Sequence, residues 1–369
     1  MPRRAAQPEC ETLRTMALGA RSAVGRIGLA VGVGLAALGL SSCGSGSRSE
    51  TGVAAATPSV STTTVTTTAT ATTTATTTAT TTATVTLPGV GKPPVTIGDE
   101  NLPEQFLLGQ LYYQALKAQG FQVTLNQSIG PPQVVMQALA TGQLAMYPEY
   151  LDTWDQDVAG LKEQFRTRSA AYAAGQHYAF KHGLELLDPT PFSDTNAVAV
   201  AFDYAVENQV QSISDLFKVS SKLTLGGPPQ FQQSATGLPL VENTYGVVPA
   251  AFKPLEIGAQ YQALDQGTVQ AAVVDTTDPQ LLSGSYPLLH DPENMFGWGN
   301  VVPVASTKAL DAEGPVFIDT INRVSSLLSL DMMRELNAQV VLYNQDPATV
   351  AQQFLQEHDV LPPPTPNGG

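Results

Sequence analysis

The chain has 369 residues, of which 43% are hydrophobic and 14% are charged, and its formal net charge is −14. Nucleic-acid binding depends on clustered lysine and arginine, so this acidic balance argues against a nucleic-acid partner. The two cysteines, Cys10 and Cys43, both lie near the start of the chain. The remainder can therefore form neither a disulfide framework nor a thiolate metal site, and we expect no metal and no cofactor.

An uncharged stretch at residues 27–40 follows Arg21 and Arg26. It is shorter than the roughly 20 residues that a membrane-spanning helix needs, and it has the proportions of the apolar part of a signal peptide. We predict that residues 1–42 are a signal peptide, with Met16 as an alternative start.

The sequence Leu-Ser-Ser-Cys-Gly at residues 40–44 resembles the lipobox of bacterial lipoproteins. The resemblance implies that Cys43 is diacylated and becomes the first residue of the mature protein. Such an anchor would hold the chain on the outer face of the cytoplasmic membrane. The alternative is an ordinary signal peptide with an incidental cysteine.

Residues 61–86 contain 18 threonines in 26 positions, with a repeated Ala-Thr-Thr-Thr unit. No alternating apolar face is present for a sheet to cover, so the composition predicts a disordered stalk. We therefore assign residues 43–94 to a lipid anchor and a disordered Thr-rich linker. Residues 361–369, which are rich in proline and glycine, are predicted to be a disordered tail.

The body of the chain begins with alternating strand and helix patterns. A strand at residues 95–98 precedes a helix that starts near Pro103 and ends at Gly120, and a strand at 121–125 precedes a helix at 134–142 and a strand at 144–147. This order predicts an α/β fold with a mainly parallel sheet, in which ligands approach the carboxyl ends of the strands.

Residues 137–146 and 262–271 share one local pattern, namely a helix end, a glycine and a strand. If the two strands belong to two similar lobes, their ends bring residues 147–150 and 274–276 into a shared cleft. Chance is the alternative explanation, because helix-glycine-strand junctions are common.

Residues 97–105 and 130–153, including Tyr-Pro-Glu-Tyr at 147–150, resemble the substrate-binding proteins of glycine betaine, choline and carnitine ABC importers. Further matching segments are residues 193–200, 213–216, 237–239, 245–246 and 257–264. The resemblance implies a two-lobed type II periplasmic-binding-protein fold with a hinge that closes around a ligand. It divides the body into a first lobe at 95–196 and 301–360 and an inserted lobe at 197–300.

The resemblance also implies a function. The chain would capture an osmoprotectant or quaternary-amine ligand and deliver it to an ABC permease with its ATPase subunit, as a monomer and not as an enzyme. One alternative is a surface lipoprotein that acts as a sensor or binds a different small molecule. Another is hydrolysis by paired carboxylates, for which Glu149 and Asp275 are the candidates.

Family members hold a trimethylammonium group in a cage of tyrosines, because the aromatic quadrupole attracts quaternary cations. By motif, Tyr150 and Thr153 match site positions, whereas two further cage tyrosines correspond to Asn196 and Asp275. The last corresponds to Gly299, beside which stands Trp298. We expect Trp154 and Trp298 to rebuild part of the cage, and Tyr147 is a weaker candidate for it.

Two basic positions that bind the ligand carboxylate in the family correspond here to Glu100 and Ser234. The site therefore gains Glu100 and Asp275 beside Asp194. Desolvated carboxylates without partners are costly, so three of them in one cleft favour a cationic ligand. We expect choline or another amine rather than glycine betaine.

Asp152, Asp155 and Asp157 lie close together in sequence, as in part of a calcium-binding loop. The spacing and the glycine of an EF-hand are absent, so the sequence favours a solvated acidic loop.

Overall fold

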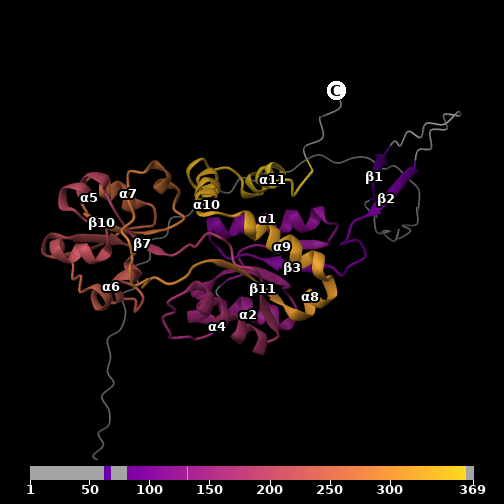
Figure 1. Cartoon of the computed structure of the whole chain (residues 1–369), viewed down its shortest axis with the longest axis horizontal. Helices are drawn as coiled ribbons and strands as arrows, with labels where there is room; N and C mark the ends of the chain where they lie inside the picture. Colours follow the sequence, from indigo (N-terminus) through magenta and orange to yellow (C-terminus); the bar gives the residue numbers. More distant parts are fainter. Residues whose placement is uncertain (1–61, 68–80, 131, 363–369) are drawn as a thin grey trace, which may run out of the picture. The chain divides into compact units, whose positions relative to one another are not determined.

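The computed structural model describes residues 62–67, 81–130 and 132–362 (Figure 1). The signal peptide, Cys43 and residues 363–369 of the predicted tail lie outside these ranges. Within the described residues, no helix is both long and apolar enough to cross a membrane. Two sheets of mixed strand direction form the body.

The five-stranded sheet has the order β4-β3-β5-β11-β6. Its strands are β3 (Val95–Gly98), β4 (Val123–Asn126), β5 (Met146–Tyr150), β6 (Leu184–Leu186) and β11 (Val301–Ser306). β3 pairs in parallel with β4 and β5, whereas β11 pairs antiparallel with β5 and β6. β11 alone runs against the other four strands, because it enters the sheet from the other sheet instead of through a helical crossover, so the sheet is mixed but mainly parallel, as the sequence predicted.

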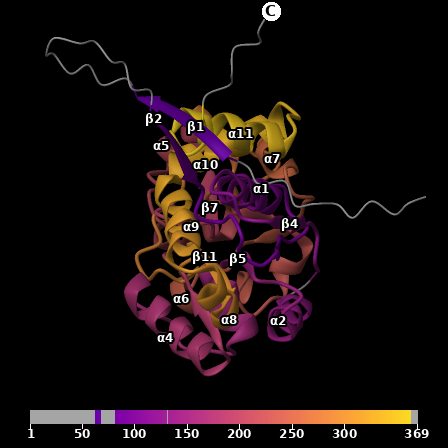
Figure 2. The same ribbon diagram turned by 90° about the vertical axis from the view of Figure 1, so that its right-hand side faces the viewer.

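Two layers of helices cover this sheet (Figures 1 and 2). On one face lie α1 (Pro103–Ala118), α9 (Pro315–Leu327) and α11 (Pro347–Glu357), and on the other lie α2 (Pro132–Thr141) and α4 (Arg168–Lys181). Side chains alternate between the layers along β5, so Met146 and Tyr150 join the first and Tyr147 joins the second. The remaining helices of this part are α3 (Leu151–Thr153), the π-helical turn η1 (Trp154–Val158), α8 (Thr307–Glu313), α10 (Leu330–Asn337) and η5 (Ala338–Leu342).

The four-stranded sheet has the order β7-β10-β8-β9, with β7 alone antiparallel. Its strands are β7 (Asn196–Val200), β8 (Thr224–Gly227), β9 (Ala251–Pro254) and β10 (Ala271–Asp275). The two faces pack into separate apolar cores, one with α6 (Leu238–Tyr245) and η2 (Ile213–Lys222), the other with α7 (Ala259–Asp265) and η4 (Pro279–Ser283). Two short helices complete this part, α5 (Phe202–Asn208) and η3 (Pro229–Gln232).

The repeated helix-glycine-strand junction is confirmed. α2 and α7 each end just before a glycine of positive φ, at Gly142 (+75°) and Gly267 (+65°), and β5 and β10 follow. Glycine fits here because the left-handed region penalises side chains with a Cβ atom. The sequence predicted that this strand begins at residue 144, whereas β5 begins at Met146.

In the threonine-rich segment the structure differs from the predicted disordered linker. β1 (Thr62–Thr67) pairs antiparallel with β2 (Thr81–Thr86). β-Branched threonine favours extended backbone, which is the conformation that both strands adopt. The division of the body into residues 95–196, 197–300 and 301–360 stays a prediction.

Candidate ligand-binding site

The chain passes between the two sheets twice, and the two connecting segments are hydrogen-bonded to each other. The Asp194 N–H donates to the Gly299 carbonyl (2.8 Å), and the Thr276 N–H donates to the Thr195 carbonyl (2.9 Å). The Thr276 hydroxyl also donates to the Ser193 carbonyl (2.7 Å). Residues 193–196, 276 and 299 therefore lie together at the crossing.

Gly299 is required at this crossing. A Cβ atom at Gly299 would lie 1.7 Å from the Asp194 carbonyl oxygen, so one of the two backbones has to move. We expect Gly299→Ala to lower the free energy of unfolding by about 1–3 kcal/mol, as overpacking does elsewhere. Urea unfolding measures this. Gly284→Ala is the control, because its Cβ would meet nothing within 4 Å and only its positive φ is unfavourable; equal losses in the two variants would contradict the steric argument.

Three carboxylates lie in or near the crossing. Asp152 is in α3, and its Cβ atom is 3.6 Å from the position of a Cβ on Gly297. Asp275 ends β10 in register with Asn196 of β7, so the two side chains share one face of the sheet. Asp194 precedes β7, and its Oδ1 is buried without a hydrogen-bond partner in the described structure.

The environment of these carboxylates disfavours their charge. Burial raises the pKa of Asp152 to about 6 and that of Asp275 to about 7, and the charge of Asp278 adds to the second effect. Burial, with the charges of Glu104 and Asp275, holds the pKa of Asp194 well above its usual range. Among the described residues none of the three has a basic group within 4 Å. The site therefore binds protons at pH values close to neutral, and a cation placed beside these carboxylates would favour their charged forms.

Glu104 of α1 is the centre of a buried hydrogen-bond network. Its Oε1 accepts from the Tyr150 hydroxyl (3.0 Å), and its Oε2 accepts from Asn337 Nδ2 (2.7 Å). Asn337 Nδ2 also donates to the Thr277 carbonyl (3.2 Å), and Arg334 Nε donates to the Thr276 carbonyl (2.8 Å). α1 and α10 are thus joined to the segment that follows β10.

Glu100 and Glu149 form a separate acidic pair. Glu149 is fully buried, and its carboxylate accepts from the Tyr147 hydroxyl (3.0 Å) and the Tyr150 N–H (2.7 Å). Burial raises the pKa of Glu100 to about 7, and burial together with the charge of Glu100 raises the pKa of Glu149. The structure thus places Glu100 beside Glu149, whereas Asp194 and Asp275 interact with Glu104. Because its oxygens are bonded inside the core, Glu149 is not placed for hydrolysis with Asp275.

The structure places three of the four predicted cage aromatics in the core. Tyr147 and Trp154 are fully buried, and Tyr150 is 8% exposed with its hydroxyl on Glu104. Trp154 Nε1 donates to the Gly175 carbonyl (3.2 Å). Only Trp298 is part-buried and lines a cavity, with its Nε1 donating to the Phe165 carbonyl (3.0 Å). The motif predicted that these aromatic residues lie near the end of a strand. It could not predict which way each side chain points, because that depends on packing.

A polar cavity of about 370 Å³ lies beside the crossing. Its wall combines three groups of residues. They are residues of α3 and η1 (Asp152, Thr153, Gln156 and Asp157), the β7 residue Asn196, and loop residues of the other sheet (Ser234, Thr236, Met295 and Phe296). Thr153 and Asn196 were predicted, whereas Asp152, Gln156 and Thr236 were not. The acidic residues at 152–157 could have indicated that this segment lines the cavity, but their charges led us to predict a solvated loop.

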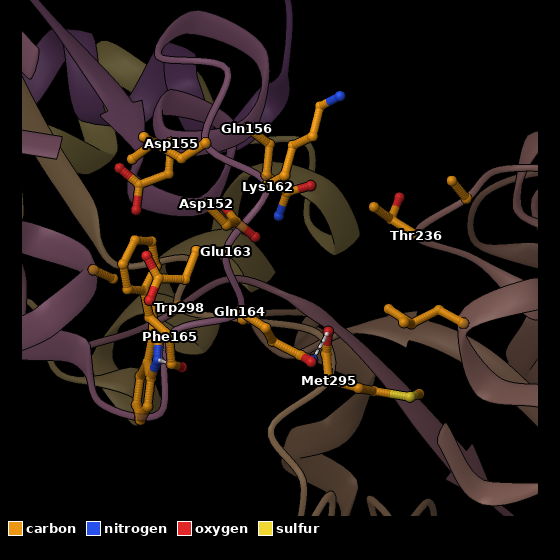
Figure 3. A pocket seen from close by; sticks show the side chains of 15 residues that line it. Asp152, Asp155, Gln156, Lys162, Glu163, Gln164, Phe165, Thr236, Met295 and Trp298 are labelled. Carbon is orange, nitrogen blue, oxygen red and sulfur yellow. Dashed lines mark hydrogen bonds between the residues drawn. The ribbon is translucent and has the colours of Figure 1, made fainter. Parts of the chain in front are cut away.

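A second cavity of about 410 Å³ shares Asp152, Gln156, Thr236 and Met295 with the first (Figure 3). We call it the Trp298 cavity. Asp155 in its wall is 4% exposed. The sequence suggested that this carboxylate is solvated, and that prediction is wrong. No group of three or more His, Cys, Asp or Glu side chains in the described ranges is arranged to hold a metal ion. Cavities of this size, bordered by elements of both sheets, have room for a small organic solute.

Two mixed sheets, crossed twice by the chain and bordered by cavities, define the type II periplasmic-binding-protein fold. Residues 93–357 match the family of the substrate-binding domain of ABC-type glycine betaine transport systems, and the chain belongs to this family. It is therefore a component that binds solute for ABC transport, and its family is not a class of enzymes.

Relatives support this assignment. A glycine-betaine-binding protein of Pseudomonas aeruginosa is 28% identical over 276 residues, which are 72% of this chain and 88% of that protein. A carnitine transport binding protein of Listeria monocytogenes is 25% identical over 288 residues, 74% of this chain and 91% of that protein. A solved structure, described as a glycine betaine/carnitine/choline ABC transporter, is 24% identical with a TM-score of 0.66, covering 72% of this chain and 99% of its own.

Proposed function

We propose that this chain captures a small organic cation that has no essential carboxylate, with choline as the test case, and delivers it to the permease of an ABC importer. The observation that carries the proposal is the set of part-buried carboxylates Asp152, Asp194 and Asp275, which have no basic partner within 4 Å in the described structure. A bound cation would supply the missing positive charge. Burying a carboxylate is favourable only when such a partner is present.

The relatives named for glycine betaine and carnitine take zwitterions, whose carboxylate requires a donor or a basic group. In the polar cavity, the wall next to Asn196 offers Ser234 and Thr236 and no basic side chain. Arg334 is the basic group close to Asp278, where burial raises the pKa of the carboxyl and the Arg334 charge offsets part of that rise, but its Nε is bonded to the Thr276 carbonyl. The site therefore favours the cation over the zwitterion.

The cellular setting follows from the ends of the chain and is part of the proposal. Cys43 would carry the lipid, and the Thr-rich segment would tether the body outside the cytoplasmic membrane. A monomer would present the closed, loaded form to a permease that works with an ATPase subunit. Support for the anchor comes from the Leu-Ser-Ser-Cys-Gly sequence at residues 40–44.

Calorimetric competition between choline and glycine betaine on the full-length chain tests the ligand class. We expect choline to bind at least about tenfold more tightly, which corresponds to about 1.4 kcal/mol. Asp203→Asn in α5, an exposed carboxylate outside both cavities, is the control and should leave the ratio unchanged. Tighter binding of glycine betaine would overturn the proposed ligand, and binding of neither compound would contradict a quaternary-amine site.

A further inference from the structure

We infer that the Trp298 cavity is a second subsite of the ligand site, and that the chain takes an organic cation bearing an apolar arm rather than choline alone. This inference rests on the function proposed above. The cationic head would lie by Asp152, and the arm would lie against Trp298, Leu240 and Leu161. The ligand class is an alkyl or arylalkyl ammonium ion.

The two cavities are adjacent parts of one site. Asp152, Gln156, Thr236 and Met295 belong to the walls of both. Figure 3 shows Thr236 across the Trp298 cavity from Asp152 and Asp155, so segments of both sheets border it. A ligand held at Asp152 can therefore extend into the Trp298 cavity without leaving contact with either side.

Size argues against a ligand as small as choline filling the whole site. The polar cavity alone has about 370 Å³, and the Trp298 cavity has about 410 Å³. Pockets of about 300–1,000 Å³ hold ligands of drug size, so the first cavity is already ample for choline. The second cavity has room for an arm of about four to six carbons.

The lining of the Trp298 cavity is chemically different from that of the polar cavity. Apolar groups come from both sides, with Leu161, Phe165 and Ala171 on one and Leu240 and Met295 on the other. The indole of Trp298 is fixed, because its Nε1 donates to the Phe165 carbonyl (3.0 Å). Across the cavity Gln164 Nε2 donates to the Met295 carbonyl (3.4 Å; Figure 3). An apolar arm would meet pre-positioned apolar surface here.

Asp155 indicates that the same cavity favours positive charge. It is 4% exposed, and its Oδ1 is buried without a hydrogen-bond partner in the described structure. The π-helical turn η1 is responsible, because it buries both Trp154 and Asp155. Burial, together with the charge of Asp152, raises the pKa of Asp155 to about 7. The wall also holds Lys162 and Glu163, so its three carboxylates outnumber its one basic group and the cavity disfavours an anionic arm.

A homologous series tests the subsite directly. Calorimetry on the full-length chain would measure the dissociation constants of tetramethylammonium and of butyl- and hexyltrimethylammonium. We expect affinity to rise by about threefold to fourfold per added methylene. Leu240→Asn and Leu161→Asn each place a polar group in the cavity wall, and each should reduce the ratio between the hexyl and tetramethyl affinities by at least tenfold. Ile257→Asn, an exposed residue outside the cavity, should keep the ratio.

The outcomes separate this inference from the proposed function. Binding of tetramethylammonium with no gain along the series would overturn the subsite and leave the cation site standing. A gain that neither leucine variant reduces would also overturn it, because the arm would then lie elsewhere. Absence of binding for every ammonium ion would overturn both proposals.

Discussion

Replacing Asp275 with asparagine is expected to weaken the binding of a cationic ligand and, in the same variant, to stabilise the unliganded protein. Both effects come from one part-buried carboxylate. Burial raises the pKa of Asp275 to about 7 from 3.8, and Asp278, Glu104 and Asp152 add negative charge around it. One unit of pKa shift corresponds to about 1.4 kcal/mol, so removing the charge should stabilise the empty site at pH 8 by about 2–4 kcal/mol.

The sign of the pH dependence follows from the two pKa values. Below pH 3.8 the carboxyl is protonated in both the folded and the unfolded chain, so it makes no difference to stability. Between pH 3.8 and about 7 the folded chain binds more protons, and its stability falls as the pH rises. The Asp275→Asn substitution should therefore raise the free energy of unfolding by its full amount above pH 7 and by almost nothing at pH 4.

Urea unfolding at pH 8 and pH 4, with choline titrations of the same samples, measures both effects. We expect choline affinity to fall by at least about tenfold at pH 8, because the variant loses a negative charge beside Asn196, which lines the polar cavity. Asp203→Asn is the matched control, since this exposed carboxylate lies outside both cavities. A variant that is less stable at pH 8, or that binds choline as tightly as the original chain, would remove Asp275 from the site.

In the original chain, the affinity for a permanently charged ligand should rise between pH 5 and pH 8. Asp152, with a pKa of about 6, and Asp275 both ionise in this range, and a bound cation favours their charged forms. Binding should therefore release protons at pH 6. Titrations in buffers of different ionisation enthalpy detect this release.

The order of elements could be predicted from sequence because it depends on local patterns. The glycines at 142 and 267 follow helices and precede strands, as their spacing indicated. Antiparallel β7 and β11 were not predicted, since strand direction depends on where the chain crosses between sheets. Threonine content likewise gave no reliable sign of the β1 and β2 pair.

The acidic character of the site could be predicted better than the residues that form it. The acidic character of Asp194 and Asp275 was read from the sequence, and the structure brings Asp275 close enough for its charge to contribute to the raised pKa of Asp194. Glu100 carries the same charge but lies beside Glu149. The burial of Asp155 depends on a π-helical turn, for which the sequence Trp-Asp-Gln-Asp-Val gave no signal. One irregular turn therefore decides whether that acidic group is solvated or lines a cavity.

Tyr147 and Tyr150 show why aromatic residues at a strand end are ambiguous. Successive strand residues point to opposite faces, and both faces of β5 are covered by helices. Aromatic rings at this strand end can therefore pack into either core instead of facing a ligand. The sequence does not distinguish a tyrosine that packs in the core from one that faces a ligand, because the residue type is the same in both.

Trp154 allows the sharpest test of this distinction. Its side chain is fully buried, lies edge to face with Tyr178 at 5.9 Å between ring centroids, and donates to the Gly175 carbonyl. Trp154→Ala should lower the free energy of unfolding by about 3–5 kcal/mol, as removal of a buried aromatic ring does. Trp298→Ala should cost clearly less, because the Trp298 ring is only part-buried. Urea unfolding of the two variants measures the difference.

Binding by the milder variant Trp154→Phe completes the test, because phenylalanine keeps an aromatic ring in the core and preserves enough stability for titration. If Trp154 supports the fold alone, this variant should lose stability while its choline affinity stays within about twofold of the original. A cage ring would behave in the opposite way, since phenylalanine is the weaker partner for a quaternary cation. Loss of choline affinity without loss of stability would return Trp154 to the ligand site and contradict the packing that the structure shows.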